Sequence, residues 1–234
     1  MKSVSSNTES KRRVGIHAAD FVRDGMQIGI GTGSTVAFFI EELGRRIRGG
    51  LHIQGVATSY YTRLLCIRNG IPILDSMMLD HLDLAVDGAD EIDPSLNAIK
   101  GGGAAHTCEK VIASMADEFI LIADETKLVS NLCINFPLPV EVIPAALALA
   151  EKRIGELGGT PRIRKAIRKD GPVMTENGNF ILDITFQAAP EDLELLDVRL
   201  KKIPGLLETG LFLGMAQKAL IGSAGSVRMI LPRG

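Results

Sequence analysis

The sequence contains no tryptophan and only two tyrosines, and aromatic residues make up 4% of its 234 residues. So few aromatic side chains argue against a stacking surface for single-stranded nucleic acid. Neither sign of charge dominates, because 26 Lys and Arg stand against 28 Asp and Glu, which gives a net charge of −2. The chain as a whole is therefore not drawn to nucleic acid or to an anionic membrane, and an anionic ligand would need a local site.

Long apolar runs and paired cysteines are also missing. Although 46% of the residues are hydrophobic, no stretch reaches the about 18 apolar residues of a membrane span, and the polar N-terminus lacks a signal-peptide core. Cys66, Cys108 and Cys133 are widely spaced and form no Cys-x-x-Cys pair, which argues against a disulfide framework and a structural zinc site. We expect a cytoplasmic protein with reduced thiols.

Strand-like and helix-like segments alternate along the first 136 residues. The pattern predicts strands at 26–30, 53–57, 71–74, 82–86 and 119–123, and helices after the polar residues 1–10, after the turn at 31–35, and at 60–69 and 104–116. Such alternation is typical of an α/β fold. We predict a Rossmann-like, doubly wound, mainly parallel sheet with helices on both faces.

The pattern changes after Pro137. A strand, a helix, two strand-like segments separated by the hairpin turn 176–179, and a further helix follow one another, which resembles a split βαβ, ferredoxin-like α+β lobe. We therefore predict a catalytic domain formed by residues 1–136 plus about 207–234, and a small α+β lobe at 137–206.

A glycine-rich loop, Gly-Thr-Gly-Ser-Thr at 31–35, joins the first predicted strand to a helix. Glycines let the backbone turn tightly, and the N-terminus of the next helix aims N–H groups and its positive dipole end at an anion, so the loop suits a phosphate. A tight turn without a ligand is the alternative. A dinucleotide fingerprint is excluded because Ser34 stands where it needs glycine, and a nucleotide P-loop because Gly-Lys-Ser/Thr is absent.

Three carboxylates in five residues, Asp-Gly-Ala-Asp-Glu at 87–91, directly follow the predicted strand 82–86. That is the carboxyl end of a strand, where open α/β sheets bind ligands. A solvated acidic loop and a divalent-metal site are alternatives. The lysine and glycines at 100–103 favour pairing with an organic substrate instead, because a metal cage normally gathers further oxygen or nitrogen ligands.

The run Lys100-Gly-Gly-Gly103 precedes the helix that carries Glu109 and Lys110. Successive glycines expose N–H groups to an oxyanion or hydroxyl, and Lys100 adds a full positive charge beside them. Glu109 stands about two turns into the helix, near enough to face the same pocket. Each charge alone would be ordinary on a protein surface, but their combination indicates a site.

Taken together with Phe-Pro-Leu-Pro-Val-Glu-Val-Ile-Pro at 136–144, these motifs resemble, in order and spacing, the type A ribose-5-phosphate isomerases. The resemblance spans nearly the whole chain. It implies an aldose-ketose isomerase of the non-oxidative pentose phosphate pathway that interconverts D-ribose 5-phosphate and D-ribulose 5-phosphate through a cis-enediolate. It also implies no metal or other cofactor, a sugar phosphate as the small-molecule partner, and a homodimer or homotetramer.

The resemblance also implies roles for individual residues. Glu109 would be the catalytic base, assisted by Asp87, Asp90 and Lys100. The substrate-binding residues that it implies are Thr32, Gly33, Ser34, Thr35, Asp87, Gly88, Ala89, Asp90, Lys100, Gly101, Gly102, Gly103 and Lys127, with a looser match at Thr58, Ser59 and Thr62.

Two residues depart from the family pattern, because His106 and Cys108 stand where an aliphatic residue and an arginine are common. Their spacing with Glu109 does not bring three ligands to one helix face, so a metal site is disfavoured. Two other functions are alternatives. An amino-sugar phosphate isomerase or deaminase would be expected to use a histidine, which the acidic loop lacks. A sugar-phosphate sensor of a transcription regulator would need a DNA-binding module, and only about one helix precedes the first strand.

Overall fold

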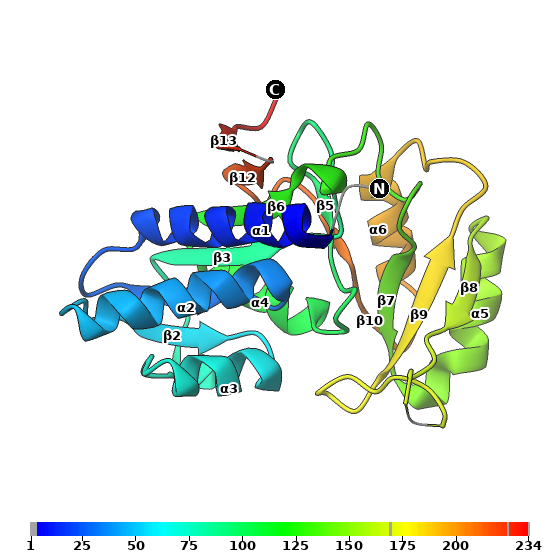
Figure 1. Ribbon diagram of the computed structural model, residues 1–234. Coiled ribbons are helices and arrows are strands. Elements are labelled where there is room, and N and C mark those ends of the chain that lie inside the picture. The colour runs from blue at the N-terminus through cyan, green and yellow to red at the C-terminus, as the bar shows by residue number, and fades with distance from the viewer. Residues whose placement is uncertain (1–3, 169, 224, 234) are drawn as a thin grey trace.

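The computed structural model describes residues 4–168, 170–223 and 225–233. It contains a larger sheet with α1 and α2 in front and, beside it, a smaller sheet with α5 and α6 (Figure 1). Within the described ranges, no helix combines the length and apolarity that a bilayer crossing demands.

Six strands form the larger sheet in the order β13-β12-β6-β3-β1-β2. They are β1 (Gln27–Ile30), β2 (Gln54–Ala57), β3 (Leu84–Gly88), β6 (Phe119–Asp124), β12 (Lys218–Gly222) and β13 (Val227–Ile230). Every neighbouring pair is parallel except β12 with β13. The doubly wound, mainly parallel sheet that the alternation predicts is thus confirmed.

Helices cover both faces of this sheet. They are α1 (Val4–Ala18), α2 (Ser34–Arg48), α3 (Tyr60–Arg68) and α4 (His106–Met115). On one face, α1 and α2 bury Val14 and Phe39 in a cluster that includes Ile28 and Ile30 of β1. On the other face α4 comes very near to β1, because a Cβ at Gly29 would lie 2.4 Å from Cγ2 of Ile112. Glycine in this strand therefore makes room for the helix.

The smaller sheet is antiparallel throughout, in the order β10-β7-β9-β8. Its elements follow the chain as β7 (Leu138–Val142), α5 (Leu147–Glu156), β8 (Thr160–Ile163), β9 (Phe180–Thr185), α6 (Leu193–Lys201) and β10 (Leu206–Thr209). This is the predicted split βαβ arrangement. The sheet and its helices have a hydrophobic cluster of their own. The division into domains 1–136 plus 207–234 and 137–206 stays a prediction, because sheets alone do not show which parts fold independently.

The remaining elements are short. A three-stranded sheet, in the order β11-β5-β4, is made of β4 (Glu91–Ile92), β5 (Ala98–Ile99) and β11 (Leu211–Phe212). Single turns of 3₁₀ helix occur at η1 (Ala19–Phe21), η2 (Ser76–Met78), η3 (Glu125–Lys127) and η4 (Pro144–Ala146).

Two expectations about single elements are wrong. Residues 71–74 form only an isolated bridge between Ile73 and Gly55, at the far edge of the sheet beyond β2. The first helix begins at Val4 rather than after Ser10. The polar start is compatible with a helix because Arg13 pairs with Glu9 one turn earlier, at 3.1 Å.

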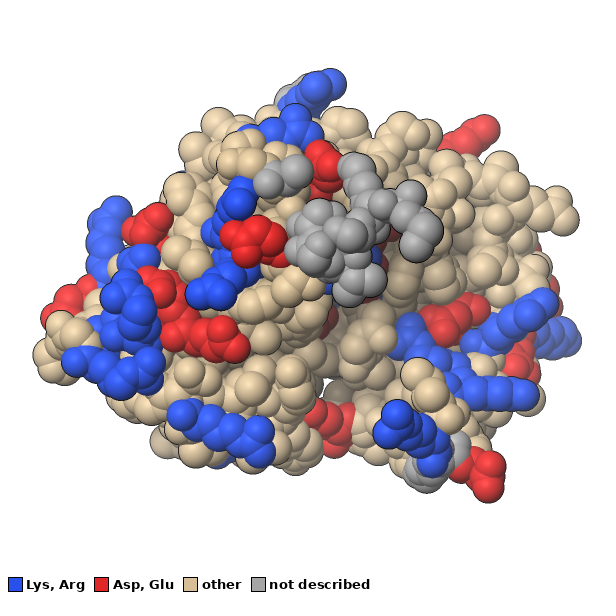
Figure 2. All heavy atoms as spheres, in the orientation of Figure 1, with Lys and Arg blue, Asp and Glu red and all other residues tan. Residues whose placement is uncertain are grey.

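The two larger sheets are joined at the hairpin loop 174–179, which reaches toward α3 (Figure 1). There the N–H of Tyr60, at the start of α3, donates to Oε1 of Glu176 at 2.6 Å. Figure 2 shows acidic and basic side chains interspersed over the visible face, without one large patch of a single sign. That distribution agrees with the small net charge.

Candidate active site

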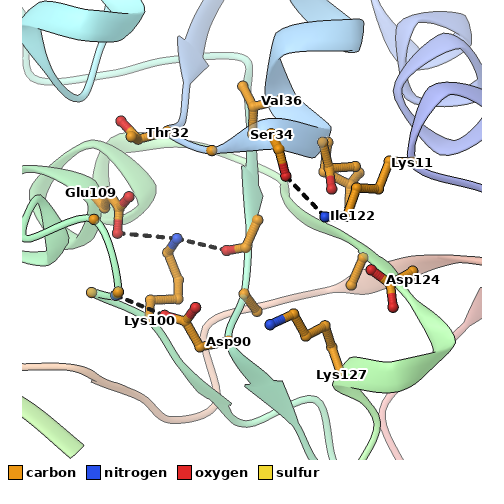
Figure 3. A pocket seen from close by; sticks show the side chains of 18 residues that line it. Lys11, Thr32, Ser34, Val36, Asp90, Lys100, Glu109, Ile122, Asp124 and Lys127 are labelled. Carbon is orange, nitrogen blue, oxygen red and sulfur yellow. Dashed lines mark hydrogen bonds and ion pairs between the residues drawn. The ribbon is translucent and has the colours of Figure 1, made fainter. Parts of the chain in front are cut away.

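A pocket lies at the carboxyl ends of β1, β3 and β6. In this sheet β2 lies on one side of β1 and β3 on the other, so the direction in which strands are added reverses at β1. Open α/β sheets bind ligands at such a switch point. Its lining is Lys11, Thr32, Gly33, Ser34, Thr35, Val36, Gly88, Ala89, Asp90, Lys100, Gly101, Gly102, Gly103, Glu109, Ile122, Ala123, Asp124 and Lys127 (Figure 3). All the residues that the resemblance assigns to the substrate line this pocket, except Asp87 and the more loosely matched Thr58, Ser59 and Thr62.

The glycine-rich loop presents the N-terminus of α2 to the pocket. Gly33 adopts a positive φ of 134°, in the left-handed region that favours glycine, and no side chain caps the helix. The first bond into α2 runs from the N–H of Ala37 to the carbonyl of Gly33, so the N–H groups of residues 34–36 lie ahead of it. This end of the pocket therefore suits an anion.

Thr58, Ser59 and Thr62 support the loop from beneath and are not part of the lining. The Thr32 hydroxyl oxygen lies 2.8, 2.7 and 3.1 Å from their three hydroxyl oxygens. Thr62 also donates to the carbonyl of Gly31 at 2.7 Å. These three residues fix the conformation of the loop.

Asp87 lies beneath the pocket, 3% exposed. Its Oδ1 accepts the N–H groups of Gly88 at 2.6 Å and Thr32 at 3.1 Å, and its Oδ2 lies 2.9 Å from Nζ of Lys100. The carboxylate thus links the glycine-rich loop to the buried lysine.

Lys100 stands between two carboxylates. Its Nζ is 3.1 Å from Oε2 of Glu109 and donates to the carbonyl of Gly88 at 2.6 Å. Lys100 and Glu109 are only 2% and 4% exposed. One buried cation therefore faces two acids, and burial makes a full negative charge on both acids costly.

Burial, together with the neighbouring Asp87, raises the pKa of Glu109 to about 8, and Lys100 opposes this rise only in part. Burial also opposes the charge on Lys100, but Asp87 and Glu109 outweigh it, so the pKa of the lysine lies above its ordinary value. Burial raises the pKa of Asp87 as well, although Lys100 and the N–H groups of Gly88 and Thr32 oppose this rise. With its pKa at about 8, Glu109 is largely protonated in the free protein at neutral pH.

The glycine turn after Lys100 lies against Asp90. The N–H of Gly102 donates to Oδ2 of Asp90 at 2.8 Å, and the N–H of Ala104 closes the turn on the carbonyl of Gly101 at 3.0 Å. Gly101 has a φ of 111° and Ala104 a φ of 60°, so the turn passes twice through the left-handed region. Strained backbone of this kind is frequent at functional sites.

Two lysines flank the anion end. Nζ of Lys11, from α1, donates to the Ser34 hydroxyl at 3.1 Å. Lys127 belongs to η3, whose N-cap Asp124 accepts the N–H of Thr126. Figure 3 shows Lys11 and Lys127 on one side of the pocket and Glu109 on the other.

The prediction from sequence missed Lys11, Val36, Ile122, Ala123 and Asp124. A signal for Lys11 exists: it shares a helix face with Val14 and Ala18, three and seven residues later, and both of these are fully buried. A lysine on a buried stripe has a structural or functional reason to be there.

Other notable residues of the motifs face elsewhere. Glu91 accepts the N–H groups of Cys133, Asn135 and Phe136, each at 2.8 Å, so its role is to hold a loop. His106 is fully buried under the glycine turn, and burial lowers its pKa to about 4. Cys108 lines a separate small cavity together with Glu141.

Glu141 of β7 joins the smaller sheet to α4. Its carboxylate, 1% exposed, accepts hydrogen bonds from Thr107, Thr175, Asn177 and Asn179. Burial alone would raise the pKa of Glu141, but these donors outweigh it and the pKa is lowered. Thr107 stands two residues before Glu109, so the network anchors the helix turn that carries the candidate base.

The sequence model of one family, described as ribose 5-phosphate isomerase A (phosphoriboisomerase A), matches residues 54–226. The chain belongs to this family. The ribose-5-phosphate isomerase A of Methanosarcina acetivorans is 46% identical over 230 residues, covering 98% of this chain and 97% of its own. That of Methanothermobacter thermautotrophicus is 47% identical over 221 residues, covering 94% and 96%.

Solved structures of the family have the same fold. Ribose 5-phosphate isomerase A from Methanocaldococcus jannaschii superposes with a TM-score of 0.92 at 41% identity, covering 96% of this chain and 99% of its own. A D-ribose-5-phosphate isomerase in complex with phospho-erythronic acid also has a TM-score of 0.92, at 44% identity, with 96% and 98% covered. The family and the fold class predicted from the sequence are both confirmed.

Proposed function

We propose that the protein interconverts D-ribose 5-phosphate and D-ribulose 5-phosphate, a step of the non-oxidative pentose phosphate pathway. The observation that carries this proposal is the buried row Asp87–Lys100–Glu109 at one end of a pocket whose other end suits a phosphate. Membership of the family supports the same activity.

The two ends of the pocket suit the two ends of the substrate. The phosphate binds at Thr32, Gly33, Ser34 and Thr35, between Lys11 and Lys127. The sugar lies along residues 87–90 and 100–103, with its carbonyl carbons beside Glu109. Binding the phosphate far from the reacting carbons contributes affinity and fixes their orientation.

Glu109 acts as the base. Moving the carbonyl from C1 to C2 requires removal of the weakly acidic proton on C2 and its delivery to C1, which one carboxylate can do on one face of a cis-enediolate. The raised pKa of Glu109, about 8, suits an acid-base group that works near neutral pH.

Lys100 stabilises the negative charge that develops on oxygen in the enediolate. A donor in such a role can contribute about 3 kcal/mol to the transition state. Asp87 and Asp90 orient the hydroxyls, assist ring opening and relay a proton between O1 and O2. Side chains of the protein supply each of these steps, and no metal or other cofactor has a part in the proposal.

The test is conversion of ribose 5-phosphate to ribulose 5-phosphate by the purified protein in excess EDTA, with Glu109→Gln as the comparison. We expect activity in EDTA and a loss of about 10²-fold to 10⁴-fold in kcat for the variant, which keeps the shape of the side chain without a base. Near wild-type turnover in Glu109→Gln would reject the role of the base. A folded wild-type protein without activity would favour the sugar-phosphate sensor or the amino-sugar enzyme.

The expected homodimer or homotetramer and the cytoplasmic location stay predictions. On α3, the side chains of Tyr60, Tyr61, Leu64 and Ile67 are all more than half exposed, a face that would suit a second copy of the chain. Sedimentation velocity at several protein concentrations would test self-association.

A further inference from the structure

Arg164 follows β8 of the smaller sheet and reaches the glycine turn of the pocket. Its Nη1 donates to the carbonyls of Gly101 at 2.7 Å and Gly102 at 3.1 Å. Arg164 is absent from the pocket lining, so within the described part of the chain its hydrogen bonds to the site are those to the two carbonyls.

Asp183 of β9 holds the guanidinium in place. Nε of Arg164 donates to Oδ2 of Asp183 at 2.9 Å, and Nη2 donates to Oδ1. The pair is bidentate and mostly buried, with side-chain exposures of 15% and 22%. Such pairs fix the orientation of both groups, so Nη1 is held at one position facing the turn.

Peptide planarity carries this constraint to the other side of the turn. In a trans peptide the carbonyl of one residue and the N–H of the next point in opposite directions, and the described residues contain no cis peptide. With the carbonyl of Gly101 directed to Arg164, the N–H of Gly102 points to Asp90, where it donates at 2.8 Å. With the carbonyl of Gly102 directed to Arg164, the N–H of Gly103 also points away from the arginine.

The N–H of Gly103 has no hydrogen-bond partner among the described residues, although Gly103 lines the pocket. A positive charge on the two carbonyls also polarises their peptide groups and strengthens the N–H groups as donors. We propose that Arg164 is a positioning residue for the isomerase reaction, holding the Gly102–Gly103 peptide so that the Gly103 N–H donates to the sugar oxygen that becomes negative.

This inference rests on the proposed function and adds to it. It makes the oxyanion end of the site, at the Gly103 N–H, depend on a residue of the smaller sheet. The loop at the phosphate end is instead held by Thr58, Ser59 and Thr62, which follow β2 of the larger sheet. Loss of Arg164 should therefore affect the two ends differently.

The experiment compares Arg164→Ala and Arg164→Lys with Arg162→Ala as the matched control, because Arg162 is an exposed arginine two residues earlier on β8. For each variant we would measure kcat and KM for ribose 5-phosphate, and binding of phospho-erythronic acid and of inorganic phosphate. Phospho-erythronic acid carries a planar carboxylate that resembles the enediolate, so its binding reports on the oxyanion end. Inorganic phosphate reports on the other end.

For Arg164→Ala we expect kcat and the affinity for phospho-erythronic acid to fall by at least about tenfold, as for a misplaced oxyanion donor, with phosphate binding unchanged. Arg164→Lys should lie between the wild type and Arg164→Ala, because one ammonium can reach the carbonyls but cannot pair bidentately. Added guanidinium should restore part of the activity of Arg164→Ala and leave Arg162→Ala unchanged.

Equal kcat in Arg164→Ala and Arg162→Ala would overturn the proposal, and so would parallel losses of phosphate binding and turnover, which indicate general damage to the site. If Arg164→Ala does not fold, the same comparison with Arg164→Lys decides. A wild type that does not turn over ribose 5-phosphate but binds phospho-erythronic acid in an Arg164-dependent way would reject the isomerase function and keep the role of Arg164 at the turn.

Discussion

Gly31 and Asp87 approach each other so closely that no other residue fits at position 31 without movement. A Cβ there would lie 2.0 Å from both Cγ and Oδ1 of Asp87. The same carboxylate lies against Lys100. Gly31, in the glycine-rich loop, therefore determines where Asp87 and Lys100 lie in the site.

Gly31→Ala should therefore damage catalysis and stability together. The methyl group pushes Asp87 away from Lys100, and overpacking of this kind costs about 1–3 kcal/mol. Thermal unfolding and turnover of ribose 5-phosphate would measure the two effects. Gly155→Ala is the control, because a Cβ there meets nothing within 4 Å inside α5. It should keep full activity and gain up to about 1 kcal/mol. Wild-type kcat in Gly31→Ala would contradict the proposed link.

The pH dependence of kcat/KM should have an acidic limb near pH 8. Only the ionised form of Glu109 can remove a proton, so the rate rises as pH passes through its pKa of about 8. The charge of Asp87 contributes to the raised pKa of Glu109, so Asp87→Asn should lower the pKa of Glu109. The acidic limb in the kcat/KM profile of this variant should therefore lie at lower pH. A limb at the same pH in both proteins would mean that another group is being titrated.

The same group should make stability depend on pH. Below pH 4.5, the ordinary pKa, Glu109 is protonated in both the folded and the unfolded chain. Between there and about pH 8 the unfolded chain loses this proton while the folded protein keeps it, so the free energy of unfolding declines as pH rises. The decline should be smaller in Glu109→Gln, measured by urea unfolding across this range. Identical pH profiles for the two proteins would argue against the raised pKa.

Lys11 should matter for affinity more than for chemistry. It lies at the anion end beside Ser34, on the opposite side of the pocket from Glu109 (Figure 3). We expect Lys11→Ala to weaken inorganic phosphate and raise KM about tenfold, with a smaller change in kcat, because one charge-assisted contact contributes about 1.5–3 kcal/mol at most. Lys152→Ala, an exposed lysine on α5, is the control. Equal KM values for the two variants would remove Lys11 from the site.

Glu141→Ala should destabilise the protein, although Glu141 does not line the pocket. The substitution leaves four donors from two segments, α4 and the hairpin 174–179, without their acceptor, and each unsatisfied buried group costs about 1–3 kcal/mol. Chemical denaturation should show a loss of at least about 2 kcal/mol. Glu141→Gln, which keeps one acceptor oxygen, should lose less. If both variants are as stable as the wild type, the network contributes nothing measurable.

The parts of the site that are local in the sequence could be predicted from it. The loops 31–35 and 87–90 each follow a predicted strand, and strands of a parallel sheet end at the same edge, so the meeting of these two loops follows from topology. The third loop, 100–103, follows no predicted strand, and only its lysine and glycines indicated a place beside them. Glu109 follows because it lies on the helix that starts after the third loop. The substrate roles of these residues stay predictions.

The remaining parts depend on how distant segments pack. Lys11 reaches the pocket only because α1 lies against α2, and Arg164 reaches the glycine turn only because the smaller sheet stands beside the larger one. The spacing of Lys11 with Val14 and Ala18 indicates a buried helix face but not the pocket, and nothing in the spacing of Arg164 indicates its contact. The wrong strand at 71–74 has a related cause. An apolar segment at a sheet edge needs a partner along its length to form a strand, and among the described residues Gly55 alone pairs with it.

The contact between Tyr60 and Glu176 has a spectroscopic consequence. Because the chain has no tryptophan and its two tyrosines, Tyr60 and Tyr61, both begin α3, near-ultraviolet emission of the unlabelled protein originates at the junction of the two larger sheets. The Tyr60 N–H that holds Glu176 of the hairpin 174–179 belongs to one of these two residues, so the emission comes from the segment on which the hairpin lies. Tyrosine emission of the unlabelled wild-type protein can therefore be recorded in stopped-flow mixing with substrate, and a change in it would locate a rearrangement at the start of α3.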